Sequence, residues 1–113
     1  MNYITSRVRE SATQPRERSE KSSEDISVIK EALSACQKRI KKYPSFSLLL
    51  SIERQIVYVR AVVEGSEKDK SRLNELTLGV YAVREFFDTD REFAELLVDV
   101  NDIANRLKFD RNK

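Results

Sequence analysis

Apolar residues recur along most of the chain at the spacing of an α-helix. In the first such segment they lie alternately three and four positions apart, at Ile26, Ile29, Leu33, Cys36 and Ile40. The same spacing returns in three further segments, which begin and end with Leu49 and Val63, Leu73 and Phe87, and Phe93 and Leu107. Each segment therefore has one apolar stripe along one side of a helix. The pattern predicts four helices, over about residues 24–42, 46–64, 69–87 and 90–107.

Residues that end helices separate these segments. Pro44 disfavours helical backbone at Tyr43, and Gly65 suits the left-handed position that follows a helix. Asp88-Thr89-Asp90 separates the third segment from the fourth. Connections of about three to six residues make neighbouring helices antiparallel. We therefore predict an all-α fold, a compact antiparallel bundle of four helices, in which Gly79 lets two helices pack closely.

The second helix carries more apolar residues than one stripe requires. Phe46, Leu50 and Val57 form a second stripe beside the first. A helix that is apolar on nearly all sides usually lies at the centre of its bundle, and we predict this place for residues 46–64. The same spacing gives four further expected core residues, namely Leu49, Leu76, Val83 and Phe86.

The N-terminal segment has a different composition from the rest. Residues 11–24 contain no apolar residue larger than alanine, so burial cannot offset the entropy that ordering them would cost. We predict a polar N-terminal tail over residues 1–22, followed by one helical domain over residues 23–109. The apolar stripes begin only after this boundary.

Composition argues against an enzyme. The chain has no histidine and one cysteine, so it lacks a Ser–His or Cys–His nucleophile pair, the usual zinc ligand sets and an intrachain disulfide. It also lacks a phosphate-binding loop and a dinucleotide fingerprint. We therefore predict no catalytic residues, no metal and no cofactor, and a buried structural thiol at Cys36, which lies on the first stripe. Without a membrane-length apolar run or a signal peptide, we expect a cytoplasmic protein.

Charge is unevenly placed along the chain. The net charge is +2, but residues 23–113 contain 16 basic and 16 acidic residues and are neutral, which argues against a nucleic-acid partner. Residues 85–102 hold seven acids and one base, a local charge of −6. Four of these acids share one side of the last predicted helix and are here called the acidic ridge: Glu92, Glu95, Asp99 and Asp102. A polarised surface without catalytic groups indicates an inhibitor or binding module.

Two stretches of the sequence resemble a known family. The first runs through Tyr43-Pro44-Ser45-Phe46, Leu49-Leu50-Ser51, Glu53-Arg54-Gln55 and Tyr58-Val59-Arg60. The second, in the same order and spacing, runs through Leu76-Thr77-Leu78-Gly79, Ala82-Val83-Arg84-Glu85-Phe86 and Thr89-Asp90. Both are similar to a family of small helical bacterial immunity proteins that neutralise toxins secreted by the type VI system, notably NAD(P)+ glycohydrolases. The resemblance extends over about residues 25–107.

The resemblance implies a bacterial cytoplasmic protein that binds a cognate secreted toxin and occludes its active site, and it favours an NAD(P)+ glycohydrolase as that toxin. Polar and aromatic residues off the apolar stripes are the candidate contacts, namely Glu53, Tyr58, Tyr81 and Glu85, together with the acidic residues Asp88, Glu92, Glu95 and Asp99. Two other hypotheses remain open. One is a non-catalytic helical scaffold or self-associating interaction module, and the other is a nucleic-acid binder that uses Lys38–Lys42 and the basic tail.

Overall fold

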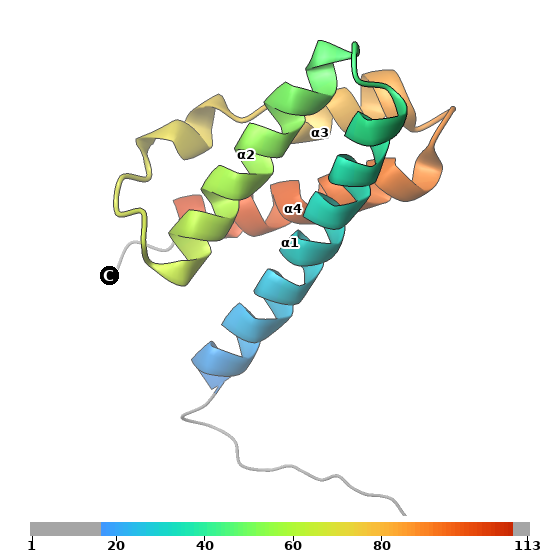
Figure 1. Ribbon diagram of the computed structural model, residues 1–113. Coiled ribbons are helices and arrows are strands. Elements are labelled where there is room, and N and C mark those ends of the chain that lie inside the picture. Colours follow the sequence, from blue (N-terminus) through green and yellow to red (C-terminus); the bar gives the residue numbers. More distant parts are fainter. Residues whose placement is uncertain (1–16, 110–113) are drawn as a thin grey trace, which may run out of the picture.

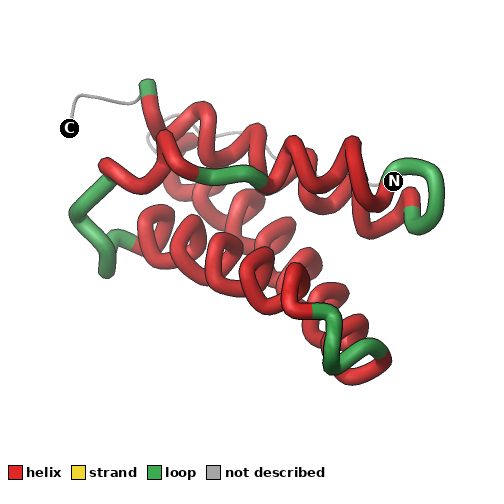
Figure 2. Tube along the Cα trace, turned by 90° about the horizontal axis from the view of Figure 1, so that it is seen from above, coloured by secondary structure: helices red, strands yellow, loops and turns green. Residues whose placement is uncertain are grey.

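The fold is built from helices. A computed structural model describes residues 17–109, and their side chains from residue 23 onward. The helices are α1 (Glu17–Lys42), α2 (Ser47–Glu64), α3 (Leu78–Tyr81) and α4 (Arg91–Lys108), with a 3-10 helix at Ser71–Glu75 and a π-helical turn at Ala82–Phe86. Figure 1 shows α1 and α2 side by side, with α4 crossing behind them, and Figure 2 gives the view from above. The all-α prediction is confirmed.

The first, second and fourth apolar stripes form the core. Ile29 and Cys36 of α1, Ile52 of α2, and Phe93 and Val100 of α4 are all inaccessible to solvent. These three helices contact one another in every pairwise combination, so their stripes enclose one common interior. None of the helices described between residues 17 and 109 has both the length and the hydrophobicity of a membrane span.

The first helix begins earlier than predicted. It starts at Glu17, so residues 17–22, assigned to the polar tail, belong to α1. Adding a residue to an existing helix costs far less than starting one, so a polar segment rich in good helix formers can extend a helix whose later turns are packed. Residues 1–16 of the predicted tail lie outside the described residues.

The third predicted helix is not continuous. Leu76 has an extended backbone, with φ −70° and ψ 144°, between the 3-10 helix and α3. Gln55 of α2 stabilises this break, because its Oε1 accepts the Thr77 N–H at 2.8 Å and its Nε2 donates to Thr77 Oγ1 at 2.9 Å. The backbone amide of Thr77 therefore bonds to a side chain of α2 rather than to a carbonyl of its own helix.

This break changes which side of the third segment is buried. Leu78, Ala82 and Phe86 face the core, whereas Val80 and Val83 are 49% and 63% exposed. The assignment of Val83 to the core was therefore wrong, and that of Phe86 is confirmed. Leu76 is partly buried. The irregular backbone and the π-helical turn that follows it shift the helical phase that spacing alone predicts.

The second stripe of α2 does not face the interior. Phe46, Leu50 and Val57 are 42%, 41% and 47% exposed, so the prediction that α2 lies at the centre of the bundle was wrong. The stripe that begins at Leu49 is the side that packs against α1 and α4. The apolar surplus of α2 therefore lies on the surface.

Both glycines have structural reasons. Gly65 has φ +86° and ends α2 in the left-handed conformation, as predicted. A Cβ atom at Gly79 would lie 3.0 Å from Nδ2 of Asn101 on α4. Gly79 therefore permits the close approach of α3 and α4 that the sequence predicted.

Candidate functional site

The acidic ridge lies on the outer side of α4. All four of its carboxylates are exposed, as the helical spacing predicted. Partial burial raises the pKa of Asp99, and the charges of Asp102, Glu95 and Glu31 of α1 raise it further. Asp99 is thus close enough to Glu95 and Asp102 for their charges to repel one another. A cationic partner would relieve this repulsion.

An aromatic groove lies beside one end of this ridge, between the α1–α2 corner and the π-helical turn. It holds about 290 Å³ and is lined by Arg39, Tyr43, Phe46, Leu49, Glu85, Phe86, Thr89 and Asp90. Tyr43 is 52% exposed and Phe46 42% exposed, although both are aromatic. The Phe46 ring lies 6.5 Å from that of Phe86, which packs edge-on at 5.0 Å against the buried Phe93. Packed aromatic rings therefore give the groove one firm wall.

An ion pair contributes to the lining of the groove. Arg39 donates from Nε to Asp90 Oδ2 at 2.6 Å and from Nη2 to Asp90 Oδ1 at 3.0 Å. These bonds lower the pKa of Asp90 and raise that of Arg39. The charge of Glu92 also raises the Arg39 pKa, so the first residue of the acidic ridge lies near the groove.

The structure brings some candidate contacts together and separates others. Glu85 lines the aromatic groove, and Asp88 is exposed in the turn before α4. Glu92, Glu95 and Asp99 follow on the acidic ridge. Tyr81 is only partly exposed and packs against the core. Five acidic candidates thus lie along the surface that runs from the π-helical turn onto α4.

Tyr58 is not a surface residue. Its side chain is 7% exposed, and its hydroxyl donates to the Asp69 carbonyl at 2.7 Å. The Arg72 guanidinium lies 5.0 Å from the ring centre. Tyr58 therefore holds the loop after α2 against that helix. The expectation that Tyr58 lies off the buried side was wrong because the stripe assignment did not include the loop that covers it.

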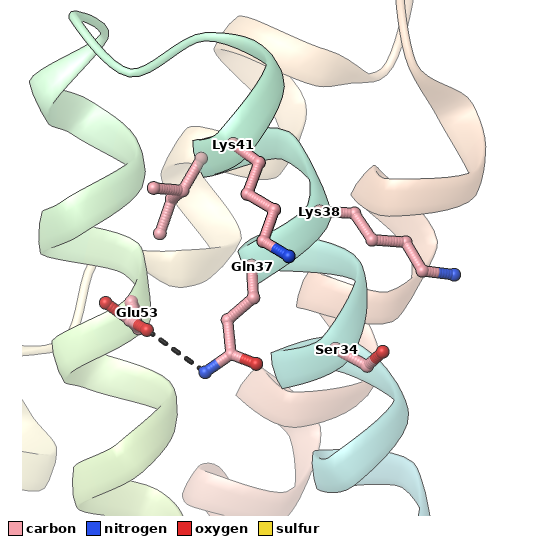
Figure 3. A pocket seen from close by; sticks show the side chains of 6 residues that line it. Ser34, Gln37, Lys38, Lys41 and Glu53 are labelled. Carbon is pink, nitrogen blue, oxygen red and sulfur yellow. Dashed lines mark hydrogen bonds between the residues drawn. The ribbon is translucent and has the colours of Figure 1, made fainter.

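Glu53 takes part in a contact between two helices. Its Oε2 accepts a hydrogen bond from Nε2 of Gln37 on α1 at 3.2 Å, and Figure 3 shows the two side chains pointing toward each other. They border a depression of about 440 Å³ that Lys38 and Lys41 also line. The carboxylate of Glu53 therefore already has a hydrogen-bond partner within the fold, and the charged side chains that share its depression, Lys38 and Lys41, are basic.

Two kinds of group could support catalysis in the described residues, a metal-binding cluster and the thiol of Cys36. The described residues contain no group of three or more acidic, cysteine or histidine side chains placed to hold a metal ion. Cys36 is fully buried, as predicted, and its Sγ lies 3.5 Å from the Leu49 carbonyl oxygen. Burial raises the pKa of this thiol to about 11, so it is not a reactive thiolate at neutral pH.

Sequence reasoning missed the aromatic groove. The sequence pattern places Tyr43 where the first helix ends and Phe46 in a second apolar stripe, and neither assignment predicts a groove. The available signal was that stripe itself, since α2 has more apolar residues than its buried side can hold.

The comparison with known families decides where the chain belongs. The family model described as Tsi6 matches residues 24–106. The chain is a member of the Tsi6 family. It is 42% identical over 74 residues to the Immune protein Tsi6 of Pseudomonas aeruginosa strain PAO1, which covers 66% of this chain and 79% of that protein.

Solved structures extend this finding to the fold. The structure of Tse6 in complex with Tsi6 matches with a TM-score of 0.72 and 38% identity, covering 74% of this chain and 89% of that chain. The structure of Tsi6 from P. aeruginosa matches with a TM-score of 0.68 and 39% identity, covering 71% and 83%. The family model spans most of the described residues and leaves residues 1–23 and 107–113 unmatched.

Proposed function

We propose that this member of the Tsi6 family is an immunity protein that binds a cognate secreted toxin and occludes its active site in the bacterial cytoplasm. The observation that carries the proposal is the match to Tsi6 in a solved complex with Tse6, over 74% of this chain. The resemblance to immunity proteins of the type VI system favours an NAD(P)+ glycohydrolase as the toxin.

Electrostatics supports the acidic ridge and its neighbours as the contact surface. A cleft that binds NAD(P)+ must attract phosphates, so it carries positive potential. The negative surface formed by Glu85, Asp88, Glu92, Glu95 and Asp99 complements such a cleft and would speed the encounter of the two proteins. Tyr81 adds an aromatic side chain at the border of this surface. We propose these residues as the toxin-binding site, with no catalytic role for any of them.

The test is protection by the purified chain. The probe is the cognate toxin domain, sought as the product of a toxin gene directly upstream of the gene of this chain and assayed for NAD(P)+ cleavage with increasing amounts of the chain. We expect stoichiometric loss of toxin activity, and no NAD(P)+ turnover by the chain alone. Full toxin activity at a large molar excess of the chain would contradict the proposal.

Self-association is a second candidate function, favoured by the exposed stripe of Phe46, Leu50 and Val57 on α2. A helix with an uncovered apolar side can pair with a copy of itself. Sedimentation analysis of the chain alone tests this idea. A monomer at concentrations of tens of micromolar would exclude it as the main role.

A further inference from the structure

We propose that the aromatic groove is the socket for a basic side chain, lysine or arginine, that projects from the toxin. The inference rests on the proposed function and names the chemistry of one contact within it. The acidic ridge would attract the toxin over a broad surface. The groove would provide the close, desolvated contact that holds it.

The shape of the groove suits a long side chain. Its walls come from the α1–α2 corner, through Tyr43 and Phe46, and from the π-helical turn, through Glu85 and Phe86. Aromatic walls pack well against the methylene stem of a lysine or arginine, while the charged head reaches a polar rim. Exposed aromatic residues next to a concave surface are typical of the residues that contribute most to binding.

The charge of the lining selects a cation. Its three charged residues are Arg39, Asp90 and Glu85, which give +1, −1 and −1 and leave a net −1. Arg39 and Asp90 neutralise each other through two hydrogen bonds. Among the described residues none is bonded to the Glu85 carboxylate, so this group remains available to a partner. The unbalanced charge of the groove therefore belongs to Glu85.

One nearby cation gives the inference a sharp test. The Nζ of Lys42 lies 5.6 Å from the centre of the Tyr43 ring, at the edge of the groove. It would repel a basic side chain in the groove and attract an acidic one. Removal of the Lys42 charge therefore discriminates between the two kinds of occupant by the sign of its effect.

The experiment measures the Kd between the full chain and the cognate toxin domain used to test the proposed function, by titration calorimetry. We expect Phe46→Ala to weaken binding by roughly 30-fold and Glu85→Gln by roughly tenfold, as for central interface residues. Glu85→Lys should weaken it further, and one Lys→Glu or Arg→Glu change in the toxin should restore it. Lys42→Gln should tighten it.

Matched controls separate the groove from general effects. Glu75→Gln and Glu75→Lys make the same charge changes on the 3-10 helix, and Val57→Ala truncates an exposed apolar residue of α2 outside the groove. All three should bind as the unaltered chain does. Circular dichroism checks folding, and Tyr43→Ala replaces Phe46→Ala if the latter unfolds.

Each outcome has one meaning. If the groove variants bind like the controls, the groove is not the socket, while binding by the unaltered chain still supports the proposed function. If Phe46→Ala weakens binding but the Glu85 variants do not, or if Lys42→Gln weakens it, the occupant is not basic and the inference fails. If the unaltered chain does not bind the toxin, the proposed function itself fails.

Discussion

Arg39 near the end of α1 and Asp90 at the start of α4 form a two-point ion pair that joins segments far apart in the sequence. The guanidinium also donates from Nη1 to the Ala35 carbonyl at 3.0 Å and lies 4.7 Å from the centre of the buried Phe93 ring. Its orientation is thus fixed from three sides. Because Asp90 precedes the acidic ridge and Arg39 lines the aromatic groove, this pair sets the position of the two surfaces relative to each other.

Asp90→Asn should destabilise the fold in a pH-dependent way. The Arg39 hydrogen bonds lower the pKa of Asp90 below its ordinary value of 3.8. A lowered carboxylate pKa contributes stability above pH 3.8 that is lost as the pH falls through the lower, folded-state value. We expect a loss of about 1–2 kcal/mol at pH 7, between the values for exposed and buried pairs.

Urea unfolding from pH 7 down to pH 2 measures this effect. The difference in the free energy of unfolding between Asp90→Asn and the unaltered chain should become smaller in the acid range, where the side chain at position 90 is neutral in both. Asp88→Asn is the matched control, since it removes a neighbouring exposed carboxylate. If Asp90→Asn and Asp88→Asn lower the free energy of unfolding equally at every pH, the Arg39–Asp90 pair contributes no specific stability.

Asp99→Asn should raise stability and weaken toxin binding at the same time. Burial and neighbouring acids raise the Asp99 pKa, so its charged form is disfavoured in the folded state. At pH 7 the ionised group therefore destabilises the fold, and this penalty disappears below pH 3.8. We expect the free energy of unfolding to rise by roughly 0.5 kcal/mol at neutral pH, a small gain because the group is only partly buried. Thermal melts at pH 7 and pH 3 and toxin titrations measure both effects, and a variant that loses stability at pH 7 would contradict the argument.

The helical spacing predicted most of the fold because α1, α2 and α4 pack through single stripes such as that from Phe93 to Leu107. The same spacing wrongly predicted one continuous helix over residues 69–87, where the side chain of Gln55 on α2 bonds to Thr77 and stabilises a break. A contact between residues so distant in the chain leaves no periodic signal. The acidic ridge followed directly from spacing on one helix. The aromatic groove did not, because whether Phe46 is covered depends on how α1, α2 and the π-helical turn meet.

Gly79→Ala should lower the stability of the fold when residue 101 is asparagine and raise it when residue 101 is alanine. Alanine favours helical backbone over glycine by about 0.5–1 kcal/mol. Its Cβ atom, however, would lie only 3.0 Å from Nδ2 and 3.2 Å from Cγ of Asn101. We expect Gly79→Ala to destabilise the unaltered chain and to stabilise an Asn101→Ala chain. Urea unfolding of the unaltered chain, the two single variants and the double variant measures both effects. Equal effects in the two backgrounds would show that the contact does not restrict position 79.

Deletion of residues 1–22 should leave the bundle folded. Asp25 is the first buried side chain among those described, and it accepts hydrogen bonds from Arg106 at 2.9 and 3.2 Å. A chain that starts at Ser23 should therefore melt within about 4 °C of the full chain, the shift that about 1 kcal/mol produces in a domain of this size. A chain that starts at Ile26 lacks Asp25 and should melt lower. Similar melting of the two truncated chains would contradict a structural role for the Asp25–Arg106 pair.

Double charge reversal on the acidic ridge should slow toxin association. Glu92→Lys with Asp99→Lys converts two exposed acids to bases without touching the core, so helicity should not change. We expect the association rate constant to fall by roughly tenfold at low ionic strength, because complementary charge acts mainly on the encounter. Salt screens exposed charges, so the difference in association rate between the variant and the unaltered chain should shrink as ionic strength rises.

Stopped-flow measurements of association from low to high salt test this prediction. The control is Glu67→Lys with Glu75→Lys, a double reversal of equal charge in the segment between α2 and α3. Equal slowing by both pairs would mean that net charge alone governs the encounter, and no slowing by either would mean that the acidic ridge lies outside the contact.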